Sequence, residues 1–242
     1  MHFDKLQEYL SYSRIERYLI ATGNDTSNAI ELYRTNLKIA QSFHPIIGIL
    51  EVILRNRIHS ILSNYFEDTD WIINQKKEFM SHPSLTYSDS RTGRKMINDY
   101  LKKAIENSEK RLIRRNTPIS SGKIIADQNF GFWTDLFELS HYKILRGRPI
   151  QAFNNLPSGV GRIEICERLN KIRKFRNRIH HNEPICFKGN EINLTATEEV
   201  YIAINDLLKW IDPELLPWIT NLDTVKQKIS IAKELQFLRG KK

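Results

Sequence analysis

The chain has 242 residues, a formal net charge of +9, a pI of about 9.5 and a mean hydropathy of −0.45. This length can bury a sizeable core, in one domain or in one domain with a small additional lobe. Two cysteines, Cys166 and Cys186, are too few for a disulfide framework or a cysteine-based metal site. The composition therefore favours a helix-rich cytoplasmic protein with reduced thiols.

Basic residues cluster in two segments of the chain. Residues 162–178 contain seven Lys and Arg against two Glu, and residues 102–115 contain six against two. Such clusters favour phosphate-bearing partners such as RNA, although a solvated surface or an anionic membrane surface would have the same composition. The longest apolar run, about residues 45–54, contains Glu51 and is too short to span a bilayer. The N-terminus lacks the pattern of a signal peptide, so no membrane association is expected.

Helical periodicity prevails in the first third of the chain. A first helix is expected around residues 6–10, and a Ser13–Glu16 capping-box pattern predicts the start of a second. Thr26 or Ser27 would cap the third helix. Pro45 is expected to begin a long helix that ends near Phe66, because proline is favoured in the first turn.

The rest of the chain is expected to alternate helices with surface loops. The expected order is a mobile loop at 81–93, a basic helix at 94–115, an aromatic helix at 130–137, loop at 146–161, a helix at 162–182, a small hairpin near 185–194, and two or three closing helices interrupted at Pro213 and Pro217. No long linker divides the chain, so we expect a single all-α domain spanning residues 1–242, with one small β-hairpin.

Residues 175–184, with the sequence Phe-Arg-Asn-Arg-Ile-His-His-Asn-Glu-Pro, carry the densest chemistry in the chain. On a helical wheel, the apolar residues between Ile165 and Ile179 form one core stripe, and Arg176 lies within it. A buried arginine is rare unless it is paired, so Arg176 is expected to meet a carboxylate, a second subunit or a phosphate. A helix end with histidines that complement the helix dipole is the purely structural interpretation.

The two histidines relate differently to Arg176. His180 lies four residues after Arg176 and therefore on the same face, whereas His181 lies about 140° away on an ideal helix. Arg176 and His181 could share one phosphate only if the helix loosens before Pro184 or if two chains build the site.

These residue types suit RNA cleavage. An imidazole can accept a proton from a 2′-hydroxyl or donate one to the leaving 5′-oxygen, while a guanidinium holds the phosphate. The 2′-hydroxyl acts as the internal nucleophile, so neither a metal nor a cofactor is required. The sequence has no tight Asp/Glu cluster of the kind that a two-metal nuclease needs, and no Gly-rich phosphate loop or zinc spacing.

An upstream segment repeats part of this motif. Residues 55–59, Arg-Asn-Arg-Ile-His, are identical to residues 176–180. Glu51, Arg55 and His59 share one helix face, with Asn56 beside it. The group is either a Glu51–Arg55 ion pair with a satisfied histidine, or a support that orders the 176–181 helix. The aromatic segment 129–133 is expected to be core, with base stacking as the alternative.

These residues resemble a known family. Arg14 with Tyr18-Leu19, residues 29–36, residues 50–59, Phe130–Trp133 and the 176–184 segment together resemble a bacterial Abi-like (abortive-infection) protein of the HEPN ribonuclease superfamily. The family's signature helix places an arginine, four residues and then a histidine. This chain departs from the pattern at His180, where the family usually has a small residue, and at Asn182, where it often has a second histidine.

The resemblance implies a HEPN-like helical bundle with extra helices, and a metal-independent endoribonuclease with an antiphage or toxin role. It implies that Arg176 and His181 are catalytic, that Asn177 assists them, and that the site lies at a homodimer interface. Arg173, Lys174 and Arg178 would bind RNA, and an antitoxin protein or a small RNA could hold the enzyme silent. His180 is an extra imidazole that, by the wheel, lies closer to Arg176.

Three functions are consistent with the residues themselves. The first is an RNA endonuclease that uses Arg176 and His181. The second is a non-catalytic RNA-binding or RNA-sensing module with the same fold. The third is a helical scaffold or antitoxin-like partner, for which RNA affinity would be weak and would show little salt dependence.

Overall fold

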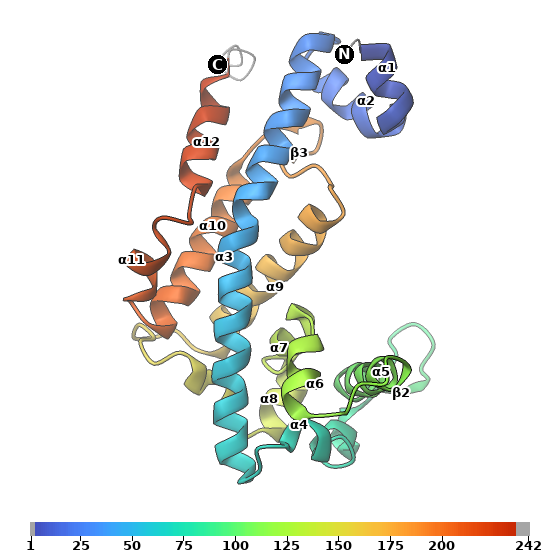
Figure 1. The fold of residues 1–242 in the computed structure, drawn as a ribbon, viewed down its shortest axis with the longest axis vertical. Helices are drawn as coiled ribbons and strands as arrows, with labels where there is room; N and C mark the ends of the chain where they lie inside the picture. The colour runs from blue at the N-terminus through green and yellow to red at the C-terminus, as the bar shows by residue number, and fades with distance from the viewer. Residues whose placement is uncertain (1–2, 236–242) are drawn as a thin grey trace. The chain divides into compact units, whose positions relative to one another are not determined.

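The computed structural model describes residues 3–235 and is predominantly α-helical (Figure 1). Its contacts group into two compact units that share helices α3 (Thr26–Phe66), α9 (Arg162–His180) and α10 (Thr195–Ile211). Within the described residues, unit 1 comprises 3–49, 174–208 and 214–235, and unit 2 comprises 50–173 and 209–213. The all-α prediction is confirmed, and the single-domain prediction stays a prediction.

Unit 1 consists of helices and one very short hairpin. Besides its parts of the shared helices, it contains α1 (Phe3–Leu10), α2 (Tyr12–Ala21), β3 (Phe187–Lys188), β4 (Glu191–Ile192), α11 (Leu215–Ile219) and α12 (Val225–Glu234). Strands β3 and β4 pair antiparallel, Phe187 with Ile192 and Lys188 with Glu191. The small hairpin predicted near 185–194 is therefore confirmed.

Unit 2 consists of short helices and a second hairpin. Besides its parts of the shared helices, it contains α4 (Trp71–Asn74), η1 (Phe79–Ser81), η2 (Pro83–Leu85), β1 (Thr86–Ser88), β2 (Lys95–Ile97), α5 (Tyr100–Arg114), α6 (Ser121–Asp127), α7 (Phe130–Asp135), α8 (Leu139–Ile144) and η3 (Arg148–Ala152). Residues 81–93, predicted as a loop, contain a 3₁₀ turn and strand β1, and the basic helix begins at Tyr100 rather than residue 94. The mobility of 81–93 stays a prediction.

The prediction that Pro45 begins a helix is wrong. Helix α3 runs without interruption from Thr26 to Phe66 and contains Pro45 in its interior. Proline removes one backbone hydrogen bond, to the carbonyl of Gln41. Pro45 and Gln41 both lie on the exposed side of the helix, where water can satisfy that carbonyl. The apolar residues on the opposite side, including Phe43 and Ile46, are fully buried and hold the helix in place.

The two predicted N-terminal caps are also wrong. Helix α2 begins at Tyr12, one residue before the expected capping box, and its preceding residue Ser11 makes no side-chain capping bond. At the start of α3, the cap is the carboxylate of Asp25, which accepts a hydrogen bond from the backbone N–H of Asn28 at 2.9 Å. Local sequence patterns identified these helices and misplaced their first residues by one or two positions.

Candidate active site

The C-terminal end of helix α9 is closed by a Schellman motif. The Glu183 N–H donates to the carbonyl of Arg178 at 2.8 Å, and the Asn182 N–H donates to that of Ile179 at 3.1 Å. Asn182 adopts the left-handed conformation that this motif requires, with φ of 51°. Pro184 follows and prevents further helix. The helix is therefore regular to His180 and then stops sharply, and it does not unwind as one interpretation of the sequence required.

This ending fixes the positions of the candidate catalytic residues. His180 is the last helical residue and His181 is the next, and both side chains are exposed, with ring centroids 5.9 Å apart. Asn177 is exposed one turn earlier. Because the helix stays regular, Arg176 and His181 remain on different sides of it, separated by about 140°.

Arg176 falls within the core stripe on the helical wheel, but the structure leaves its side chain partly exposed. The stripe residues Ile165, Leu169, Ile172, Phe175 and Ile179 are all buried. Arg176 is half-buried, and its guanidinium makes no hydrogen bond or ion pair with the described residues of unit 1. A desolvated and unpaired arginine is costly, so this group is a natural binding point for an anion.

Three other arginines surround the segment that follows the histidines. Arg14 donates to the backbone carbonyl of Asn182 at 2.9 Å, Arg17 donates to that of Gly189, and Arg178 donates to that of Pro184. Carbonyl oxygens carry no net charge, so these bonds position the guanidinium groups without neutralising them. Of these three arginines, only Arg178 also forms an ion pair with a described residue, the carboxylate of Glu183 at 3.4 Å. The sequence argument named Arg178 and gave no site role to Arg14 or Arg17.

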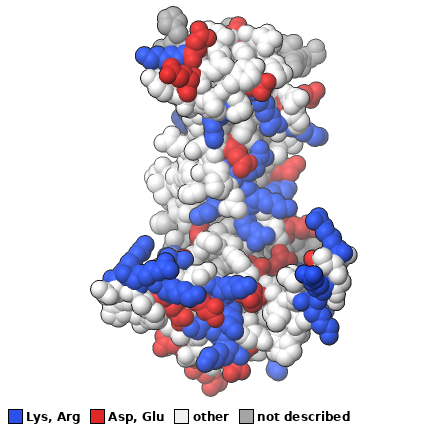
Figure 2. Space-filling model, turned by 90° about the vertical axis from the view of Figure 1, so that its right-hand side faces the viewer, with Lys and Arg blue, Asp and Glu red and all other residues white. Residues whose placement is uncertain are grey.

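The guanidinium of Arg17 also lies over the ring of Phe187, 4.5 Å from its centroid. This cation–π contact and the bond to Gly189 connect α2 to the β3–β4 hairpin. The segment that contains His181 therefore lies in a strongly basic environment. Figure 2 shows that Lys and Arg side chains occur over much of the visible surface, interspersed with acidic groups.

A buried clamp holds the backbone just after the helix end. The Ile185 N–H donates to Asn36 Oδ1 at 2.8 Å, and the Ile185 carbonyl accepts from the Thr197 hydroxyl at 2.7 Å. Asn36 and Thr197 are completely buried, and Ile185 is nearly so. Sequence reasoning missed this clamp. The only available signal was a polar residue, Asn36, among the apolar positions of a helix.

The upstream group Glu51, Arg55, Asn56 and His59 lies on α3 in unit 2. The Trp71 indole N–H donates to His59 Nδ1 at 3.0 Å, which places the imidazole proton of neutral His59 on Nε2. Burial lowers the pKa of His59 below its ordinary value. This side chain is thus a satisfied histidine within unit 2, as the structural interpretation expected.

The Nε of Arg55 is buried and makes no hydrogen bond. The expected Glu51–Arg55 ion pair stays a prediction. Asn56 is exposed on the same helix. The predicted support of the 176–181 helix by this group stays a prediction.

The remaining predicted contacts are distributed along α9 and α7. Lys174 is exposed in unit 1, and Arg173 is half-buried in unit 2. In the aromatic segment, Phe130, Phe132 and Trp133 are almost completely buried, so this segment is core and offers no base-stacking platform. Both cysteines are buried, and burial raises the pKa of Cys166 to about 11 and of Cys186 to about 12. Neither thiol is therefore a ready nucleophile at neutral pH.

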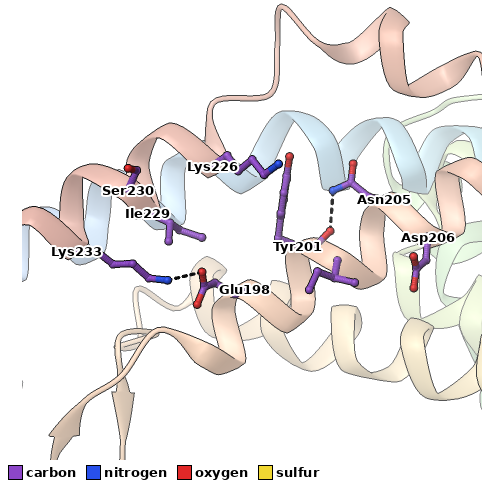
Figure 3. Close-up of a pocket in the computed structure, with 9 residues that line it drawn as sticks. Glu198, Tyr201, Asn205, Asp206, Lys226, Ile229, Ser230 and Lys233 are labelled. Carbon is purple, nitrogen blue, oxygen red and sulfur yellow. Dashed lines mark hydrogen bonds and ion pairs between the residues drawn. The ribbon is translucent and has the colours of Figure 1, made fainter.

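A groove that no sequence feature indicated lies between α10 and α12 in unit 1 (Figure 3). Its volume is about 540 Å³. Two acidic residues, Glu198 and Asp206, and two basic residues, Lys226 and Lys233, line it, and Glu198 pairs with Lys233 at 2.6 Å. Tyr201 stands in the middle. The acidic and basic side chains that line the groove balance in charge, so the groove has no preference for an anionic ligand such as RNA.

The comparisons with known proteins give no assignment. No family model, no curated protein and no solved structure matches the chain. Within residues 3–235, no group of three or more His, Cys, Asp or Glu side chains could hold a metal ion. Helix α3 is long and apolar enough to cross a membrane by length and composition alone, and 44% of its most apolar window is buried. One such helix is weak evidence, because the core helix of a soluble protein passes the same test.

Proposed function

We propose that this chain is a metal-independent endoribonuclease of the HEPN type, in which Arg176 and His181 are catalytic and Asn177 assists. One observation carries the proposal. A fixed helix end presents exposed imidazoles near a half-buried guanidinium that has no partner among the described residues of unit 1. The resemblance of the 176–184 segment to the HEPN signature supports the same assignment.

The proposed reaction uses the RNA as its own nucleophile. The 2′-oxygen attacks the adjacent phosphorus, the bond from phosphorus to the 5′-oxygen breaks, and one proton moves from the 2′-hydroxyl to the leaving oxygen. His181 would transfer a proton in this step, and the Arg176 guanidinium would stabilise the charge on the phosphate. Lys174, Arg178 and Arg173 would bind neighbouring phosphates.

The regular helix end argues for a site built by two chains. Because Arg176 and His181 lie on different sides of one helix, they are poorly placed to reach one phosphate within a protomer. In a homodimer whose α9 ends meet, Arg176 of one protomer would act beside His181 of the other. His180, on the same side as Arg176, is the alternative proton-transfer group within one chain.

Cleavage of total bacterial RNA in the presence of EDTA tests the chemistry. Wild type should cut, His181→Ala should not, and His180→Ala should retain activity. If only His180→Ala abolishes cleavage, the chemistry stands and the histidine assignment is wrong. If wild type binds RNA without cutting it, the chain is a non-catalytic RNA-binding or RNA-sensing module.

Co-expression of two inactive variants tests the composite site. When Arg176→Ala and His181→Ala protomers are produced together, some would pair as heterodimers in which one of the two sites is intact. Random pairing should then restore about a quarter of wild-type activity. A site contained in one chain would show no restoration, and a separate mixture of two Arg176→Ala preparations provides the matched control.

The biological setting rests on the family resemblance. We infer a cytoplasmic antiphage or toxin effector, without membrane association, that an antitoxin protein or a small RNA keeps silent. Expression of wild type should arrest growth of a bacterial host, and His181→Ala should not. A scaffold or antitoxin-like partner would leave growth unchanged in both cases.

A further inference from the structure

The β1–β2 hairpin of unit 2 has almost no contact with a core. All residues of the two strands are exposed, and so is the connecting turn except for half-buried Asp89. The strands pair Thr86 with Ile97, Tyr87 with Met96 and Ser88 with Lys95, and the hairpin lies next to α5 (Figure 1). An isolated two-stranded hairpin is marginally stable in water. A hairpin whose strand side chains are all exposed is therefore expected to have a role other than packing.

The turn is nevertheless well ordered by its own hydrogen bonds. Asp89 Oδ1 accepts from the backbone N–H groups of Arg91 and Thr92, at 3.0 and 2.8 Å, and from the Thr92 hydroxyl at 2.9 Å. The Asp89 N–H donates to the carbonyl of Arg94 at 2.9 Å, and Gly93 adopts the left-handed conformation. At the base, the Asn98 N–H donates to the carbonyl of buried Leu85. The hairpin is thus a preformed projection.

Its side chains combine positive charge with exposed apolar surface. Arg91, Arg94 and Lys95 make no side-chain hydrogen bond or ion pair with any residue in 3–235, and Asp89 is the only acidic residue in the hairpin. Tyr87 and Met96 lie opposite each other on one face and are 52% and 45% exposed. Positive charge can protect an exposed edge strand from pairing, which explains Lys95. It does not explain an exposed tyrosine next to an exposed methionine.

We infer that the β1–β2 hairpin is an RNA-binding arm for single-stranded substrate, with Tyr87 stacking on an unpaired base and Arg91, Arg94 and Lys95 contacting phosphates. An aromatic ring and unpaired cations carried on one projection are the combination that binds single strands without reading their sequence. The inference deepens the proposed function, since it rests on RNA as the substrate. It adds a binding surface from a segment that has no residue in the Arg176–His181 motif.

Fluorescence anisotropy with a labelled, single-stranded 2′-O-methylated oligonucleotide tests the arm, because this probe cannot be cleaved. Tyr87→Ala should weaken binding about 5- to 150-fold, as loss of one stacked base does, whereas Tyr87→Phe should bind like wild type. The triple variant Arg91→Gln, Arg94→Gln and Lys95→Gln should reduce the slope of log affinity against log salt by about 2, at about 0.7 for each lost phosphate contact.

A matched triple variant controls for net charge. Lys5→Gln, Lys209→Gln and Lys226→Gln remove the same charge from exposed positions elsewhere and should leave the salt slope nearly unchanged. The inference is overturned if both triple variants lose affinity equally, or if Tyr87→Ala and the arm triple bind like wild type. A change in self-association without a change in RNA affinity would also overturn it, and would make the hairpin a protein-pairing edge.

Cleavage of ordinary RNA separates this inference from the proposed function. If wild type does not cut RNA but the arm variants lose affinity for the probe, the endoribonuclease proposal fails and the arm stands. If wild type cuts and the arm variants bind the probe normally, the nuclease stands and the arm fails. Circular dichroism should show unchanged helicity in every variant, because all the substituted side chains are exposed.

Discussion

Replacing Asn36 with alanine should loosen the backbone that follows His181, the proposed catalytic histidine. In the native protein, Asn36 Oδ1 accepts the Ile185 N–H at 2.8 Å in a fully buried environment. Alanine leaves that N–H without an acceptor, which costs about 1–3 kcal/mol. Asn36 Nδ2 is itself buried without a partner, so its removal offsets part of that cost. We expect a net loss of about 1–2 kcal/mol in the free energy of unfolding.

Urea denaturation followed by far-UV circular dichroism would measure this loss. Thr197→Val, a nearly isosteric change, removes the hydroxyl that donates to the Ile185 carbonyl at 2.7 Å. It should cost less than Asn36→Ala, because a carbonyl has a second lone pair and tolerates a lost donor better than an N–H tolerates a lost acceptor. The double variant should be non-additive, since both side chains hold one peptide segment. An Asn36→Ala protein within about 0.3 kcal/mol of wild type would refute the clamp.

Three further changes should affect stability in defined directions. Burial lowers the pKa of His59, so the folded state disfavours protonation of its imidazole. Neutral His59 therefore contributes to the free energy of unfolding above its ordinary pKa, and this contribution is lost as the pH falls below that value. Urea midpoints measured from neutral to mildly acidic pH should fall less in His59→Gln than in wild type. Asn182 has φ of 51°, a conformation that glycine adopts freely and valine does not. Asn182→Gly should therefore leave the free energy of unfolding nearly unchanged, whereas Asn182→Val should lower it by about 1–2 kcal/mol. Equal urea midpoints for the two variants would contradict the Schellman assignment. Phe43 is fully buried with its ring centroid 4.7 Å from that of Phe175, so Phe43→Ala should lower the free energy of unfolding by about 3–5 kcal/mol and Phe43→Leu by clearly less.

The sequence was informative wherever one local pattern determined the outcome. The stripe from Ile165 to Ile179 predicted the buried face of α9, and Pro184 predicted its end. Pro45 misled because the cost of an internal proline depends on whether the freed carbonyl meets water, which is a tertiary property. The helix starts were misplaced because neighbouring residues are acceptable caps by type, Ser11 and Ser13 for α2 and Asp25, Thr26 and Ser27 for α3.

The candidate site was predictable in part for the same reason. The exposure of His180 and His181 follows from their position at a helix end with a polar surrounding sequence. The contacts of Asn36 with Ile185 and of Arg14 with Asn182 join residues 149 and 168 positions apart. Such pairs leave no periodic signal in a single chain. The burial of the aromatic residues in 130–133 and the exposure of Tyr87, within the surface loop predicted at 81–93, were expected. The pairing of β1 with β2 was not.

The interleaved composition of unit 1 affects the order in which the chain can fold during synthesis. Residues 3–49 pack against residues 174–208 and 214–235. During synthesis, this packing cannot be completed until the later segments have emerged from the ribosome. The Asn36–Ile185–Thr197 clamp cannot form before residue 197 has emerged. A nascent or prematurely ended chain would thus lack the ordered helix end. For a protein whose proposed activity harms its own host, late assembly would confine that activity to finished molecules.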